Sequence, residues 1–150
     1  MDFSVLANDL ADIASRAFGA LIAKYYENNG MGFRTYKKLY DACITTVSDY
    51  SAGVWGLGLY PKLNSVHNRA LRTYLGVHKY APIEALSGEL SFTPPSVHRK
   101  VEMVCFWNRI IKMPDYRRPK IIYNLEYQHK NSWCRDLMSI FDQTNWRCAL

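Results

Sequence analysis

The sequence predicts an all-α protein, a multi-helix bundle of about six or seven helices with a glycine- and tryptophan-rich connecting loop. Through most of the chain, apolar residues recur at every third or fourth position, the spacing that places them on one face of a helix. No stretch alternates apolar and polar residues as a half-buried strand does. Glycine and proline fall between the periodic segments, where they end helices.

The first two helices are predicted over residues 3–28 and from Phe33 onward. In the first segment the apolar residues keep helical spacing, and the sequence "NNG" provides a stop at Gly30. The second segment also places a row of apolar and aromatic residues on one side of a helix. This side consists of Tyr36, Tyr40, Cys43 and Val47.

A glycine-rich stretch interrupts the helical pattern between residues 48 and 61. The sequence "SDYSAGVWGLGLYP" predicts a helix end and a structured loop, with a tight turn around a buried Trp55. A third helix starts near Leu63 and stops before Pro82. Its buried stripe is predicted to consist of Leu63, Val66, Ala70, Tyr74 and Val77.

The fourth and fifth helices follow in close succession. Residues 81–90 predict a short helix with Gly88 near its end. Thr93 then serves as a cap, with proline in the first turn, for a fifth helix over about residues 95–112. Because this fifth helix is apolar nearly all round, we expect neighbours to cover most of it and expect it to be the centre of the core.

Two aromatic residues of the fifth helix, Phe106 and Trp107, are expected to be buried. Beyond the sequence "MPDYRRP", two weaker segments over residues 119–128 and 132–143 predict further helices. With 150 residues, of which 49% are hydrophobic and 14% aromatic, the chain has the size and composition of one globular domain.

Charge and the N-terminal sequence indicate the kind of partner and the compartment. A net charge of +6 and a pI near 9.2 favour a polyanion or an acidic partner. The N-terminus has no basic segment before an apolar run, and its longest nearby uncharged run is too short to cross a bilayer. We therefore expect a soluble intracellular protein, nuclear or cytoplasmic, with no membrane partner.

No catalytic, metal or cofactor site is expected. A two-metal nucleotidyl transferase needs carboxylates close together, and the sequence contains no adjacent acidic pair. It also lacks G-x-S-x-G, and the stretch "GVWGLG" lacks the G-K-[ST] of a phosphate loop. His67 and His78 have no acidic or thiol companion at ligand spacing and are interpreted as surface or capping residues. The four cysteines form no C-x-x-C pair and are interpreted as reduced thiols, mostly structural.

The third helix carries the candidate binding residues. Lys62, Arg69 and Arg72 share the face opposite its apolar stripe. This pattern allows two interpretations, a solvated face on a packed helix or a basic surface for a polyanion. The arginines can equally anchor the helix to the loop around Trp55, because guanidinium stacks on aromatic rings and bonds backbone carbonyls.

Five tyrosines are candidates for base stacking. Any base offers a ring face to an exposed aromatic side chain, although core packing is the commoner use of such residues. The five are Tyr25, Tyr26, Tyr36, Tyr40 and Tyr50.

Four stretches keep a characteristic order and spacing: "LANDLADIASRAFGALIAKY", "YKKLYDACITTVSDYSAGVWG", "VHNRALRTYLGVHKYAPIEALSGEL" and "RKVEMVCFWNRIIKM". Together, over about residues 3 to 127, they resemble the region after the catalytic palm in reverse transcriptases of non-LTR retrotransposons, the LINE and jockey-like group. The most specific combination in the family is Q-N-R-A-x-R-x-x-L-G-V followed by A-P and G-E-L-G. The match is similar to the thumb and the helical connection that follows it, which in this family help to hold template and primer.

The family pattern is carried over residue by residue. Its N-R-A-x-R falls on Asn68, Arg69, Ala70 and Arg72, its L-G-V on Leu75, Gly76 and Val77, and its W-x-R on Trp107 and Arg109. The sequence departs from the pattern at His67, where Gln is usual, at Thr46, where Pro is common, and at Ser91, where Gly often follows G-E-L. The predicted nucleic-acid-binding residues are Lys62, Asn68, Arg69, Arg72 and Lys79.

The resemblance implies a thumb-like and connection region over residues 1–127 and a C-terminal helical extension over residues 128–150. Because the palm with its Asp-Asp motif, the fingers and the endonuclease are missing, we expect a fragment of an RNA-directed DNA polymerase, without catalysis of its own or a cofactor. Its expected partners are an RNA or DNA template-primer and the missing palm of the same transposable element. The alternative is a helical protein-interaction or scaffold domain that binds no nucleic acid.

Overall fold

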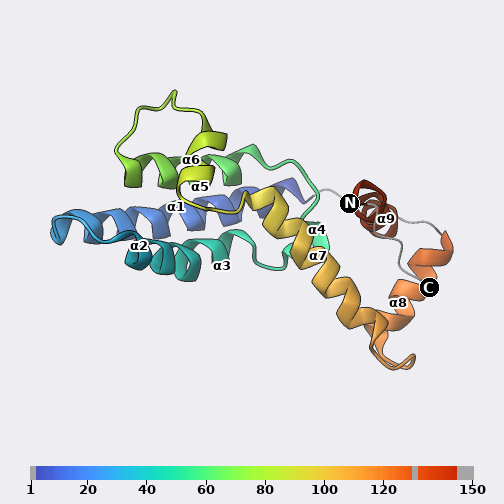
Figure 1. The fold of residues 1–150 in the computed structure, drawn as a ribbon. Helices are drawn as coiled ribbons and strands as arrows, with labels where there is room; N and C mark the ends of the chain where they lie inside the picture. The colour runs from blue at the N-terminus through green and yellow to red at the C-terminus, as the bar shows by residue number, and fades with distance from the viewer. Residues whose placement is uncertain (1–2, 130–131, 145–150) are drawn as a thin grey trace. The chain divides into compact units, whose positions relative to one another are not determined.

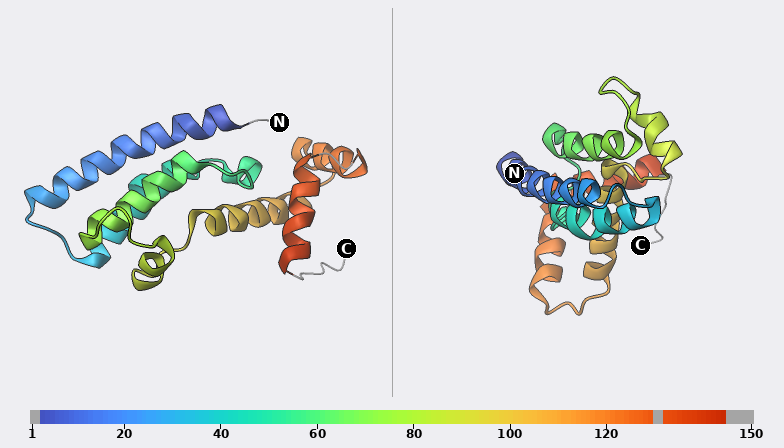
Figure 2. Two further views of the ribbon diagram at one scale, coloured as in Figure 1. Left: turned by 90° about the horizontal axis from the view of Figure 1, so that it is seen from above. Right: turned by 90° about the vertical axis from the view of Figure 1, so that its left-hand side faces the viewer.

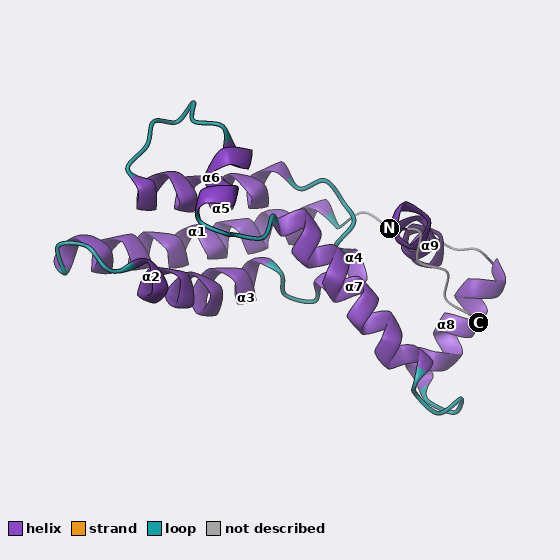
Figure 3. Cartoon of the chain, in the orientation of Figure 1, coloured by secondary structure: helices purple, strands orange, loops and turns teal. Residues whose placement is uncertain are grey.

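The computed structural model describes residues 3–129 and 132–144. Within these residues every regular element is a helix and no strand is present, so the predicted all-α class is confirmed (Figure 3). Figure 1 labels most of the elements, which are α1 (Ser4–Glu27), α2 (Phe33–Tyr40), η1 (Asp41–Thr45), α3 (Thr46–Ser48), α4 (Ala52–Trp55), α5 (Pro61–Leu75), α6 (Ile83–Glu89), α7 (Pro95–Ile111), α8 (Arg118–His129) and α9 (Ser132–Thr144).

The described residues form two compact units, where the sequence predicts one domain. The N-terminal unit consists of residues 3–50 and 59–95, and the C-terminal unit consists of residues 51–58, 96–129 and 132–144. The predicted division after residue 127 falls inside α8. Helical periodicity reports which face of a helix is buried but not which neighbour buries it, so the sequence does not show that the glycine-rich stretch belongs with α7.

In the N-terminal unit the long helix α1 packs along α5 and along the segment from η1 to α3. Figure 2 shows α1 in blue beside α5 in green. The side chains between these helices form an apolar core with several aromatic rings. Its buried members are Ala14, Phe18, Leu21, Tyr36, Tyr40, Ile44, Val66, Ala70, Leu71, Leu86, Leu90 and Phe92.

The second predicted helix is one helical stretch in which a π-helical turn, η1, joins α2 to α3. Tyr36 and Tyr40 are buried as predicted, but the next buried position is Ile44, and Cys43 is exposed. Hydrogen bonds in a π-turn run from residue i to i+5, so a face advances by more residues per turn than in an α-helix. The predicted place of Cys43 on the buried side is wrong for this reason.

Two buried tyrosines tie this stretch to α5. The Tyr36 hydroxyl donates to the Ala70 carbonyl oxygen at 2.9 Å, and the Tyr40 hydroxyl lies 2.8 Å from His67 Nδ1. Burial raises the pKa of both phenols, which therefore stay protonated in this core. His67 is only 4% exposed, so its interpretation as a surface or capping residue is wrong.

Helix α5 ends earlier than predicted. Gly76 has φ +64°, and the amide N–H of Val77 donates back to the carbonyl of Arg72 at 3.1 Å. This is the left-handed helix ending that glycine favours, and it stops the helix well before Pro82. Val77 consequently lies outside the helix and is exposed, contrary to its predicted place in the buried stripe.

Helix α6 ends in a similar turn without glycine. Ser91 has φ +49°, and the amide N–H of Phe92 donates to the carbonyl of Ser87 at 3.0 Å. This turn carries Phe92 into the core of the N-terminal unit, where it is buried. The left-handed conformation costs a residue with a side chain about 1–2 kcal/mol, so the turn holds Ser91 against its own preference.

We therefore expect Ser91→Gly to raise the free energy of unfolding by about 0.5–1 kcal/mol, because glycine removes this strain. The greater conformational entropy of glycine in the unfolded chain offsets part of the gain. Urea denaturation followed by circular dichroism measures the change. Ser65→Gly in the middle of α5 is the control and should lower stability by about 0.5 kcal/mol. Equal destabilisation by both substitutions would contradict the strain at Ser91.

The C-terminal unit is built on one face of α7. Val97 and Val101 on this helix are 46% and 52% exposed, so neighbours do not cover α7 all round as predicted. Trp107 is buried as predicted, whereas Phe106 is only partly buried. The Trp107 indole N–H donates to the Tyr123 hydroxyl at 3.1 Å. The buried members of this core are Trp107, Ile110, Tyr123, Cys134, Leu137 and Phe141.

The glycine-rich stretch packs in this unit as the short helix α4. Trp55 is buried as predicted, and the Arg99 guanidinium lies 5.9 Å from its ring centroid. A Cβ on Gly53 would lie 2.8 Å from the Cβ of Phe106, so only glycine permits this approach to α7. The Trp133 indole N–H donates to the Gly53 carbonyl at 3.1 Å. The close packing explains this glycine without a phosphate ligand.

Candidate nucleic-acid interface

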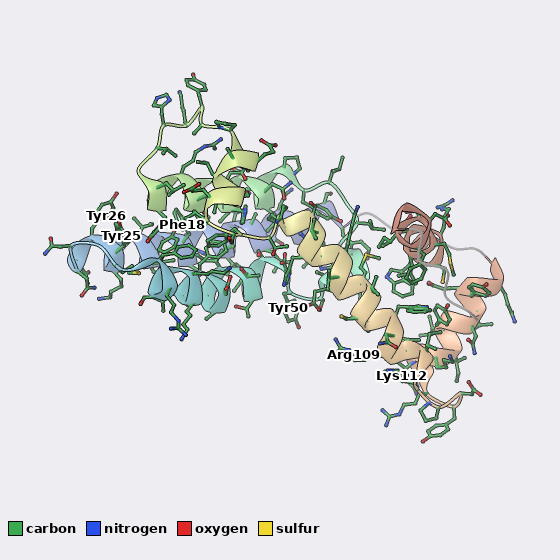
Figure 4. All side chains as sticks on the ribbon, viewed as in Figure 1. Phe18, Tyr25, Tyr26, Tyr50, Arg109 and Lys112 are labelled. Carbon is green, nitrogen blue, oxygen red and sulfur yellow. The ribbon has the colours of Figure 1, made fainter. Side chains whose placement is uncertain are left out.

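All five predicted binding residues lie in the N-terminal unit, which Figure 4 shows with its side chains. Lys62, Asn68, Arg69 and Arg72 are on α5, and Lys79 is in the loop between α5 and α6. The sequence leaves open a solvated face, a basic surface for a polyanion, or arginines that anchor the helix to the loop around Trp55. The structure gives these side chains three different environments.

Lys62 and Arg69 contact α1. The Lys62 ammonium forms an ion pair with Asp12 Oδ2 at 2.8 Å, and both side chains are at least half exposed. Arg69 Nη2 donates to the Ser15 hydroxyl at 3.0 Å, and its guanidinium lies 4.8 Å from the Phe18 ring centroid. These contacts join α5 to the same side of α1, yet both cations stay accessible to solvent.

Arg72 binds the end of the loop that follows its own helix. Its Nη2 atom donates to the carbonyl of Ala81 at 3.2 Å, and its Nε atom is buried. The arginine is partly buried, as is Asn68 one turn earlier. Of the two roles considered for Arg72, the geometry favours the anchor, but its partner is Ala81. The arginine beside Trp55 is Arg99.

The loop from Gly76 to Tyr80 is the exposed basic and aromatic part of this unit. All its residues are exposed, and Tyr80 keeps 79% of its surface in solvent. The Lys79 ammonium lies 5.0 Å from the Tyr80 ring centroid, and the His78 and Tyr80 rings are also 5.0 Å apart. A backbone hydrogen bond from Ala81 N to the His78 carbonyl, 3.0 Å long, closes the turn.

Sequence reasoning identified Lys79 but not Tyr80. The signal was present, since Tyr80 follows two potentially basic residues directly and stands between the end of a helix and Pro82. The apolar spacing continues to Val77 and so predicts that the segment belongs to the helix. Once Gly76 ends α5, the same residues become a protruding loop.

The five candidate stacking tyrosines divide by burial. Tyr36 and Tyr40 belong to the core, and Tyr25 is partly buried with its ring 6.2 Å from that of Tyr36. Tyr26 and Tyr50 are 65% and 66% exposed, and Figure 4 labels both. Of the five, only these two are largely exposed.

Other kinds of site have little support in the described part of the chain. No group of three or more histidine, cysteine or acidic side chains there can hold a metal ion. No helix within those residues is long and apolar enough to cross a membrane. Cys43, Cys105 and Cys134 are free thiols, the last of them buried with a raised pKa, while Cys148 lies outside the described residues.

Comparison with known proteins found no similar protein: no protein-family model, curated protein or solved structure matches the chain.

Proposed function

We propose that this chain is a non-catalytic part of a retrotransposon RNA-directed DNA polymerase, and that its N-terminal unit binds the template-primer. The observation that carries the proposal is the exposed loop with Lys79 beside Tyr80. A cation for the phosphates and an open ring for the bases form the combination that proteins use on unpaired nucleic acid. The net charge of +6 also favours binding to a polyanion such as nucleic acid.

The backbone also supports the resemblance at two glycine positions of the family pattern. The glycine of L-G-V falls on Gly76, and the glycine that often follows G-E-L falls on Ser91. Both residues have positive φ, +64° and +49°. Glycine adopts this region without strain, so a pattern with glycine at both places fits these two turns.

Each residue of this site has a role that follows from its contacts. Lys79 binds a backbone phosphate, Tyr80 stacks on a base, and Arg72 positions the loop through Ala81. Lys62 and Arg69 are held by exposed contacts to α1, and exposed ion pairs are worth only about 0–1 kcal/mol. A phosphate can therefore replace Asp12 as the partner of Lys62.

A protein-interaction role is the second candidate, and exposed apolar residues on α8 favour it. Ile122 and Leu125 are 56% and 52% exposed on this helix. Salt dependence separates the two functions, because phosphate binding weakens steeply as salt rises and an apolar interface hardly responds.

Removal of the loop side chains should weaken binding in two distinguishable ways. With labelled single-stranded DNA, Lys79→Ala should reduce the slope of log affinity against log salt by about 0.7. Tyr80→Ala should cost about 1–3 kcal/mol of binding and leave that slope unchanged, because stacking releases no counterion. Fluorescence anisotropy at several salt concentrations measures both.

Matched controls come from the same unit. Lys38→Ala removes an equal charge from α2, and Tyr26→Ala removes an exposed ring from α1. Arg72→Ala should lower affinity with no change of slope if it only positions the loop, whereas a slope reduced by about one unit on duplex DNA would assign it a phosphate. Binding by both loop variants equal to that of their controls would contradict the proposal.

The proposal places polymerisation in a palm outside this chain, the second expected partner. The purified chain with magnesium, primer, template and deoxynucleotides should extend no primer, because paired carboxylates are needed to hold the catalytic metal ions. Gel analysis of a labelled primer measures this. Templated extension that survives repurification would contradict the assignment.

A further inference from the structure

A second basic surface lies in the C-terminal unit, at the turn that connects α7 to α8. Arg109 and Lys112 at the end of α7, and Arg117 and Arg118 at the start of α8, are all exposed. Asp115 is the single acidic residue between positions 109 and 118, so the segment carries a formal charge of +3. Figure 4 labels Arg109 and Lys112 close together at this end of α7.

The four cations of this surface are not engaged by the side chains that the structure describes. Among the described residues, none of them has an ion pair or a side-chain hydrogen bond. Lys120 in the next turn behaves differently, because its ammonium donates to the Ile111 carbonyl at 3.2 Å and closes the end of α7. Lys62 and Arg69 also have partners, on α1. Like charges gathered without partners repel one another, and an anion relieves that repulsion.

The backbone of the turn is well fixed by hydrogen bonds. Arg117 N donates to the Pro114 carbonyl at 3.0 Å, and Lys120 N and Ile121 N both donate to the Arg117 carbonyl, at 2.9 and 3.0 Å. The turn therefore presents its cations from a defined frame, which lowers the ordering cost of binding.

An aromatic ring indicates which anion fits. Tyr116 precedes Arg117 in the turn and is 78% exposed. Unpaired nucleic acid uses both features of such a turn, because its phosphates pair with the cations and its bases stack on an exposed ring. We propose that this turn is a second site for single-stranded nucleic acid, in which Arg117 and Arg118 bind phosphates and Tyr116 stacks on a base. It does not depend on the loop between α5 and α6.

The test uses the full chain and a fluorescein-labelled oligothymidylate in anisotropy titrations at 50–200 mM salt. The double variant Arg117→Ala/Arg118→Ala should reduce the salt slope by about 1.4, from about 0.7 per phosphate on a single strand. Tyr116→Ala should lower affinity roughly 5- to 150-fold at an unchanged slope. Arg117→Lys/Arg118→Lys keeps the charge and should restore the slope.

Controls separate this site from net charge, from a membrane and from the first site. Arg34→Ala/Lys38→Ala removes the same charge from exposed positions of α2, and an equal loss of slope there would overturn the proposal. The proposal would also be overturned if the double variant bound oligothymidylate as well as the unchanged chain does, or if the double variant lost only its binding to phosphatidylserine vesicles. If the Lys79 and Tyr80 variants bind normally and the turn variants do not, only the function proposed for the N-terminal unit is contradicted. If the turn variants bind normally and the Lys79 and Tyr80 variants do not, only this second site is contradicted.

Discussion

Trp107→Ala is expected to lower the free energy of unfolding of the C-terminal unit by about 3–5 kcal/mol, the cost of truncating a large core aromatic residue. Trp107 is 7% exposed, lies 5.0 Å from the Phe141 ring centroid, and donates its indole N–H to Tyr123. Truncation leaves a cavity at the contact between α7 and the two helices that follow. It also removes the donor that the Tyr123 hydroxyl accepts from.

Urea denaturation followed by far-ultraviolet circular dichroism measures this loss. The control is Val101→Ala on the same helix, which is half exposed and should change stability by no more than about 0.5 kcal/mol. A midpoint for Trp107→Ala close to that of the control would show that α7 does not organise this unit.

Leu71→Ala should have the second largest effect, a loss of about 2–5 kcal/mol in the N-terminal unit, because buried leucines lose both their transfer free energy and a filled volume. The Leu71 side chain has no exposed surface and lies in the core between α1, α2 and α5. The chain offers a chemically identical control in Leu59, which is 92% exposed. Leu59→Ala should alter stability by about 0.5 kcal/mol or less.

The same urea measurement compares the two variants. Equal midpoints for Leu71→Ala and Leu59→Ala would contradict the assignment of α5 to a packed core. A drop confined to Leu71→Ala would support it.

Helix positions were the most predictable feature because they depend on local information. Periodic apolar residues, together with glycine and proline between them, predicted α1, α7, α8 and α9 to within a few residues. The errors lie where the backbone departs from the α-helix. The π-turn moved the buried position from Cys43 to Ile44, and the left-handed Gly76 released Val77 from the helix.

The candidate interface was less predictable, because spacing along a helix does not say what the opposite face meets. Nothing in the sequence indicated that Lys62 and Arg69 contact α1, and His67 was expected at the surface but is buried beside Tyr40. The sequence allows two roles for Arg72, and its contact with Ala81 favours the anchor.

The sequence by itself determined the helical class, the order of the helices and the positive charge, because each follows from residue type and near-neighbour spacing. Only the tertiary structure decided that the described residues divide into two compact units, that Gly53 is needed for a close approach to Phe106, and which described cations have partners. These features depend on contacts between residues that are distant in sequence, such as the hydrogen bond from the Trp133 indole N–H to the Gly53 carbonyl. The sequence shows the cations around Arg117 only as charges, and the folded chain shows that none of them has an ion pair or a side-chain hydrogen bond with another described residue.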